Sequence, residues 1–231
     1  MRGLPDERLR IAAYGSLERV NFVAHVHVAL CLAGSRTDAA AFAFGAALPD
    51  LASMAGVRLD RSALPEAVRE GVLLHHRTDA VFHSLPEFTA GVRRLSDELK
   101  TQGLPVGAAR AVGHAGWELL LDGCLLEREG TAQAFADVLA AAPDVARAVA
   151  PADPQRWRRL LATMRSDRWW LGYGDTELVA HRLQQRLRAR RRLAFAVEQV
   201  PLVASALVAA KPPVRRALDG VVAAVTAALR P

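Results

Sequence analysis

The sequence predicts an all-α fold: a single multi-helix domain with a C-terminal helical appendage. Three observations predict it. Alanine, leucine, valine and arginine dominate the composition, apolar residues recur at helical spacing, and runs of alternating β-branched residues are scarce. With 231 residues, the chain is long enough to bury a hydrophobic core. We expect residues 1–200 to form the main helical domain and residues 201–231 to form the appendage.

The helices expected in the first part of the chain are bounded mainly by prolines. Pro49 is expected to end the second helix, because proline lacks an amide hydrogen and clashes with the preceding turn. Pro65 is typical of a first helical turn. The helix that begins near Pro65 is expected to end before Pro86. The expected helices here cover residues 16–32, 37–48, 65–85, 87–100, 105–128 and 132–140.

Beyond residue 140 the pattern is less regular. An aromatic, glycine-rich cluster at residues 169–174 interrupts it and precedes a long helix with a run of arginines. After Pro201, two alanine- and valine-rich helices are expected, separated by residues 211–213. The other helices expected here cover residues 144–149, 154–165 and 175–199, and the arginines of the run are Arg182, Arg186, Arg188, Arg190, Arg191 and Arg192.

Two stretches share one arrangement of titratable residues, three of them at intervals of four. On an α-helix, each such step rises about 6 Å and turns by only about 40°, so each triplet forms a ladder along one face. Two facing ladders would bring several imidazoles and carboxylates into one small volume, which is what a divalent metal site requires. The first ladder is His75, Asp79 and His83, and the second is His114, Glu118 and Asp122.

The residues around both ladders indicate burial. His75 and Asp79 share a stripe with Val68, Val72 and Phe82, and other apolar residues lie on the far side of the same helix. The helix of the second ladder is apolar on most of its surface. A carboxylate buried there costs several kcal/mol unless it is paired. A metal would compensate Glu118 and Asp122, and so would Arg77, Arg110 or a histidinium.

The charge balance favours an anionic partner. The 30 basic residues exceed the 24 acidic ones, giving a formal net charge of +6, and Lys100 and Lys211 are the only lysines. The planar fork of arginine matches phosphate and carboxylate, so an anionic substrate or an acidic partner is expected. We do not expect a nucleic-acid partner. The alternative is a solvated arginine surface with no specific partner.

A cytoplasmic location is expected, since the segment from Met1 to Arg10 is charged and carries no apolar signal segment. The longest apolar stretches, residues 39–48 and 200–210, are shorter than the roughly 20 residues that span a bilayer. We therefore expect no transmembrane segment.

Three blocks of sequence resemble a known family. Residues 21–27 (NFVAHVH), 45–50 (GAALPD) and 71–79 (GVLLHHRTD), with Leu85 and Pro86 beyond them, are similar in order and spacing to the acyl carrier protein phosphodiesterases. The resemblance covers roughly residues 21–126 and marks a divergent member. It implies an all-α hydrolase, distantly related to the HD-domain phosphohydrolases. Such an enzyme uses a divalent metal to cleave phosphopantetheine from a carrier-protein serine.

Carried over position by position, the resemblance points to His25, Asp50, His75 and Asp79, and it places Glu118 where the family tends to have an aspartate after a tryptophan. This chain departs from the family at two positions. Leu119 replaces a histidine and His83 replaces an expected aspartate, and the chain contains no adjacent His-Asp pair. His114 and His83 are then candidate replacement ligands. The block at residues 45–50 also resembles the zinc-dependent phospholipase C proteins, so a phospholipase C-like helical bundle is a second expectation.

These observations lead to the hypothesis of a metal-dependent phosphoester hydrolase that activates water. Asp79 and Arg77 are the candidate catalytic residues, with Arg77 as a phosphate clamp. His83 and Asp122 are expected to support the ligands or to assist proton transfer. Mixed nitrogen and oxygen donors suit Mn, Fe or Zn better than calcium. The predicted metal ligands are His25, Asp50, His75, Asp79, His114 and Glu118.

The alternative hypothesis is a non-catalytic helical protein. In it, both ladders are buried hydrogen-bond and ion-pair networks, and the arginine-rich face binds an acidic partner. In the hydrolase hypothesis the substrate is a phosphoester. One candidate is a phosphoester group attached to an acidic carrier protein.

Overall fold

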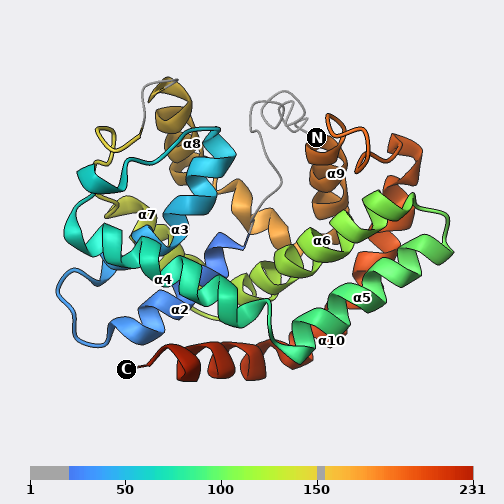
Figure 1. Ribbon diagram of the computed structural model, residues 1–231, viewed down its shortest axis with the longest axis horizontal. Coiled ribbons are helices and arrows are strands. Elements are labelled where there is room, and N and C mark those ends of the chain that lie inside the picture. The colour runs from blue at the N-terminus through green and yellow to red at the C-terminus, as the bar shows by residue number, and fades with distance from the viewer. Residues whose placement is uncertain (1–20, 150–153, 231) are drawn as a thin grey trace, which may run out of the picture.

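The computed structural model describes residues 21–149 and 154–230, and these residues form an all-helical fold (Figure 1). The described residues contain no β-strand; a single isolated bridge joins Leu59 and Val149. The all-α prediction is confirmed. The helices are α2 (Phe22–Ala33), α3 (Ala39–Ala55), η1 (Arg61–Ala63), α4 (Glu66–Phe82), α5 (Pro86–Thr101), α6 (Val106–Leu126), α7 (Thr131–Ala140), α8 (Pro154–Ser166), η2 (Trp169–Gly174), α9 (Thr176–Leu187), η3 (Val197–Gln199) and α10 (Val200–Leu229).

The arrangement brings distant parts of the sequence together around α4 and α6. Helix α3 packs against both α2 and α4, and α5 lies along α6 (Figure 1). Helix α10 runs along one side of the molecule and contacts α2, α4, α5, α6 and α9. Both ladders of the sequence analysis therefore lie on helices in the packed interior. No described helix is long and apolar enough to cross a membrane.

Two glycines allow α3 and α4 to approach each other unusually closely. A Cβ atom on Gly71 would lie 2.1 Å from the carbonyl oxygen of Phe42, and one on Gly45 would lie 2.2 Å from the carbonyl oxygen of Val68. Neither side of this crossing can accept even a methyl group without moving the backbone. The close approach brings the ring of His75 within 2.8 Å of the Ala46 carbonyl oxygen, so it sets the position of a candidate ligand.

Helix α3 does not end at Pro49 as expected; it continues to Ala55 with Pro49 inside it. Proline removes one hydrogen bond from the helix, but the residues on both sides of it are packed in the core, and Leu48 and Leu51 are fully buried. Tertiary packing therefore outweighs the local preference. As a result, Asp50 lies within a helix rather than in a turn.

The C-terminal part differs from expectation in three places. Residues 144–149 do not form a helix, and only residues 146–148 of them form a turn. Helix α9 ends at Leu187, so the arginines after it do not share a helix face. Helix α10 is continuous through Pro212 and Pro213 where two helices were expected. Glu127, the residue that caps α6, pairs with Lys211 and Arg215 on either side of these prolines, which holds both halves of α10 in line.

Helix α2 begins at Phe22. The earlier part of the helix expected over residues 16–32, like the charged segment from Met1 to Arg10, lies outside the described residues. The division into a domain over residues 1–200 and an appendage over residues 201–231 stays a prediction.

The close crossing of α3 and α4 predicts the outcome of a glycine substitution. Gly71→Ala should lower the free energy of unfolding by about 1–3 kcal/mol, because the added methyl group overlaps the backbone of α3. Gly220→Ala is the matched control: this glycine is also helical, but a Cβ there meets nothing within 4 Å. The control should raise stability by about 0.5–1 kcal/mol. Urea unfolding measures both, and equal stability of Gly71→Ala and the wild type would contradict the close crossing.

Candidate metal centre

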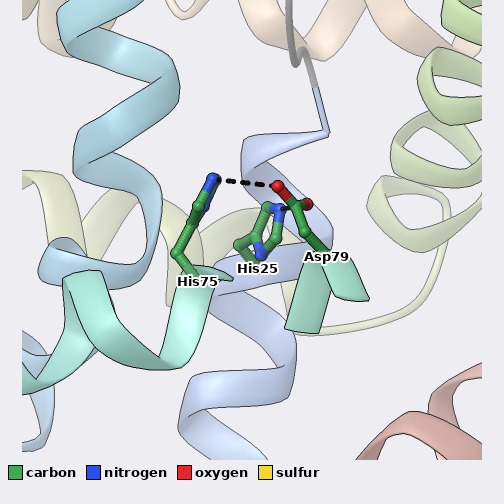
Figure 2. Close-up of side chains that lie close together, drawn as sticks. All are labelled: His25, His75 and Asp79. Atoms are coloured by element: carbon green, nitrogen blue, oxygen red, sulfur yellow. Dashed lines mark ion pairs between the residues drawn. The ribbon is translucent and has the colours of Figure 1, made fainter. Parts of the chain in front are cut away.

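His25, His75 and Asp79 form a buried group that we call the buried triad (Figure 2). His25 comes from α2, and the other two come from successive turns of α4. Their exposed fractions are 1%, 0% and 6%. The Nε2 atom of His25 lies 3.1 Å from Oδ1 of Asp79, and Nε2 of His75 lies 3.5 Å from Oδ2. The two imidazoles stack with their ring centroids 3.9 Å apart, so both rings present Nε2 to one carboxylate.

The orientation of His75 determines which of its nitrogens carries a proton. Nδ1 lies 2.8 Å from the Ala46 carbonyl oxygen, and because a carbonyl can only accept, Nδ1–H is the donor. Burial, followed by the nearby His25 ring, lowers the pKa of His75 to about 2, so the imidazole stays neutral. Its Nε2 therefore carries a lone pair. That lone pair faces Asp79 and also Asp50, whose Oδ1 is 3.9 Å away.

This geometry fits a divalent metal ion. A lone pair and ionised carboxylate oxygens that face each other repel, and a cation between them turns that repulsion into attraction. Neither ring nitrogen of His25 nor Nε2 of His75 forms a hydrogen bond with any described residue. Donor atoms that bind one ion at about 2.0–2.2 Å lie about 2.8–3.6 Å from one another. The contacts to Asp79 fall in that range, and a ligating histidine usually donates its other N–H to a carbonyl, as His75 does here.

Asp50 lies at the edge of the buried triad. It is fully buried on α3, one turn after Ala46, whose carbonyl accepts the His75 bond. This position allows a fourth ligand from a third helix.

His83, His114 and Glu118 form a second group, which we call the surface triad. His83 caps the C-terminus of α4, and the other two lie one turn apart on α6. Oε1 of Glu118 accepts a hydrogen bond from His83 Nε2 at 3.0 Å and lies 3.2 Å from His114 Nε2. The Glu118 side chain is 1% exposed, whereas those of His83 and His114 are 33% and 47% exposed. The group is thus open to solvent on its histidine side.

In the surface triad, Glu118 and His114 each stabilise the charged form of the other. Burial alone would raise the pKa of Glu118, but the hydrogen bonds from His114 and His83 lower it below its usual value. The same contact with Glu118 raises the pKa of His114 despite partial burial, and the charge of Asp79 raises it further. Glu118 is therefore an anion, and His114 favours its cationic form. The two triads are neighbours, because Asp79 lies in the last turn of α4 and His83 is the residue that caps that helix.

The structure thus divides the six predicted ligands between two neighbouring groups. His25, Asp50, His75 and Asp79 converge at the buried triad, while His114 and Glu118 meet His83 in the surface triad. His83 lies in hydrogen-bond contact with Glu118, a position that suits the supporting role predicted for it. These placements concern position; the ligand roles stay predictions.

Two predicted residues lie elsewhere. Arg77 is exposed, and its two-residue offset puts it about 200° around α4 from His75 and Asp79, so the structure does not bring it to either triad. Its role as a phosphate clamp stays a prediction. Asp122 is fully buried, but it accepts hydrogen bonds from the backbone of α2 instead of joining a triad.

The sequence analysis missed two groups at the site. The Ala46 carbonyl, which fixes His75, is a backbone atom and leaves no sequence signal. Phe88 packs its ring 4.9 Å from that of His83 and 5.2 Å from that of His114. The sequence signal for Phe88 is its place just after Pro86, at the start of the helix that follows His83.

Comparison with known proteins identifies a family. A family model described as acyl carrier protein phosphodiesterase matches residues 20–210. This span contains every member of both triads, and also Asp50 and Asp122. No curated protein and no solved structure matches the chain.

The raised pKa of His114 predicts a pH-dependent contribution to stability. A raised folded-state pKa contributes stability that is fully present below the unfolded value of about 6.5 and is lost as pH rises through the folded value. His114→Ala should therefore cost more unfolding free energy at pH 5.5 than at pH 9, measured by urea unfolding in EDTA. In a Glu118→Gln background this difference should shrink. An equal cost at both pH values in the Glu118 protein would show that the pair is not coupled.

Proposed function

Because the chain belongs to the acyl carrier protein phosphodiesterase family, we propose that it is a metal-dependent phosphodiesterase. We propose as its substrate the phosphodiester that links phosphopantetheine to a serine of an acyl carrier protein. The observation that carries the metal requirement is the neutral His75, whose Nε2 lone pair faces carboxylate oxygens inside the core.

In this proposal His25, His75 and Asp79 hold the ion, and Asp50 completes the set from α3. A divalent ion bound there would supply Lewis-acid chemistry, neutralising charge on phosphoryl oxygens and lowering the pKa of water beside it. The mixed nitrogen and oxygen donors suit Mn, Fe or Zn. Kinship with the HD-domain phosphohydrolases, or with the phospholipase C proteins, stays a prediction.

The surface triad has contacts suited to handling a proton. The contact between His83 and Glu118 has the geometry of a hydrogen bond, so in this proposal Nε2–H of His83 donates to Glu118. With Nε2 of His114 directed at Glu118, the proton on Nδ1 is the one available to a substrate. We propose that His114 gives this proton to the serine Oγ as the bond between Oγ and phosphorus breaks and water oxygen bonds to phosphorus. The attacking water releases one proton to solvent in the same step, and His114 regains its proton from solvent afterwards. The earlier prediction, that His114 and Glu118 bind metal, is the alternative use of the same residues.

The surroundings of His114 suit an anionic substrate. Arg110 lies one helical turn before His114 on the same face of α6 and is exposed. The chain as a whole carries a net charge of +6. Both features favour the approach of a phosphate group on an acidic carrier protein. Arg110 shares a helix face with His114, whereas Arg77 lies on the side of α4 away from the triads.

The alternative of a purely structural protein fits the surface triad better than the buried triad. Buried hydrogen-bond networks explain the surface triad, where donors and acceptor are matched. In the buried triad, Nε2 of His75 faces carboxylates and makes no hydrogen bond with a described residue, which favours a metal centre.

Substitution of His75 tests the metal centre. Chelated wild-type protein should bind about one equivalent of Mn, Fe or Zn by titration calorimetry and should then release phosphopantetheine from holo acyl carrier protein, followed by mass spectrometry of the carrier. His75→Ala should lose the tight binding and lower kcat/KM by more than about 100-fold, because a ligand is removed. His181→Ala on α9, away from both triads, is the control. Equal metal binding in the two variants would contradict the buried triad as the centre.

Substitution of His114 separates the proton donor from a ligand. His114→Ala should keep metal affinity close to that of the wild type and lower kcat by about 10²–10⁴-fold. Loss of bound metal in His114→Ala would instead assign His114 to the metal.

A further inference from the structure

Helix α2 begins without a cap from its own sequence. Asn21 occupies the N-cap position, but its side chain makes no capping hydrogen bond. The first amides of a helix have no partner within the helix, so a buried helix start needs an acceptor from elsewhere. Asn21, Phe22, Val23 and Ala24 are all buried, so this start lies in the interior.

Asp122 on α6 supplies that acceptor from about a hundred residues away in the sequence. Its Oδ2 accepts from the amide of Val23 at 3.1 Å, and its Oδ1 accepts from the amide of Ala24 at 2.8 Å. The side chain is completely buried. Burial raises the pKa of Asp122, and the two amide donors oppose that shift. Each oxygen is used once, so the carboxylate ties two successive residues of α2 to α6.

This tie lies next to a candidate ligand. His25 follows Ala24 directly, and its Nε2 must reach Asp79 on α4 at 3.1 Å. Two hydrogen bonds, at the amides of Val23 and Ala24, fix both the position of α2 along its axis and its rotation about that axis. On α6, Glu118 stands one turn before Asp122, so the helix that anchors α2 also carries the carboxylate of the surface triad.

Aromatic packing strengthens the same point. Phe22, which is fully buried, stacks on Phe135 with 5.5 Å between centroids and lies 5.6 Å from the ring of Tyr173. The start of α2 is therefore held by hydrogen bonds on one side and by rings on the other. The remainder of α2 packs mainly against α3.

We propose that Asp122 is a positioning residue of the metal centre: through the backbone of α2 it holds His25 where its Nε2 meets Asp79 and stacks on His75. This inference rests on the proposed function, since it takes His25 as a ligand. It assigns Asp122 a role through α2, instead of contact with the metal or with a substrate.

The test uses Co(II) as a probe, because its absorption spectrum reports the geometry of its ligands. Asp122→Asn keeps the size of the side chain but offers one acceptor, and Asp122→Ala offers none. Co(II) affinity should fall by about tenfold or more in the order wild type, Asn, Ala, with a changed spectrum. Leu99→Ala on α5 is the control: it leaves a cavity in the core and lowers stability without touching α2, so it should bind Co(II) as the wild type does.

A second readout needs no metal. In the metal-free protein, the NMR resonances of the His25 ring should shift in Asp122→Asn but not in Leu99→Ala. If Asp122→Ala does not fold, Asp122→Asn carries the test alone. Wild-type affinity and spectrum in Asp122→Asn, with unshifted His25 resonances, would overturn the positioning role. A wild-type protein that binds no Co(II) while the His25 resonances respond to Asp122→Asn would overturn the proposed function and leave the positioning of His25 supported.

Discussion

A neutral imidazole facing carboxylates in a desolvated interior is the constraint on which the site depends. The Ala46 carbonyl takes the proton-bearing Nδ1 of His75 at 2.8 Å, which leaves Nε2 to face Asp79 and Asp50. That juxtaposition is costly in a protein interior, and a cation bound between the groups would remove the cost. The close crossing at Gly45 and Gly71 brings α3 near enough for this bond. The orientation of the His75 ring therefore depends on the packing of the two backbones.

The two triads differ in burial and in bonding, and that difference suggests a division of tasks. The buried triad places donor atoms at the spacing of metal ligands, and neither Nε2 of His25 nor Nε2 of His75 forms a hydrogen bond with a described residue. The surface triad pairs two half-exposed imidazoles with one buried carboxylate, and its histidines face solvent. Helix α4 carries Asp79 and His83 one turn apart and so connects the two. A substrate phosphate that approaches from solvent would meet the surface triad first.

Much of this site could be predicted from the sequence, because helical periodicity places residues on a face without knowledge of the rest of the fold. The stripe shared by Val68, Val72, His75, Asp79 and Phe82 is buried as expected. What periodicity does not contain is pairing between helices. The bond from Asp122 to α2, the division of the ligands into two groups and the passage of α3 through Pro49 all depend on tertiary packing. Arg77 lies two residues from both His75 and Asp79, a spacing that puts it on the opposite side of the helix.

The central claim is that one divalent ion binds at the buried triad. Anomalous diffraction from crystals loaded with manganese tests it most directly. The account predicts an anomalous peak within about 2.0–2.3 Å of Nε2 of His25, Nε2 of His75 and a carboxylate oxygen of Asp79. A peak bound only by His83, His114 and Glu118, or no peak near either triad, would contradict it.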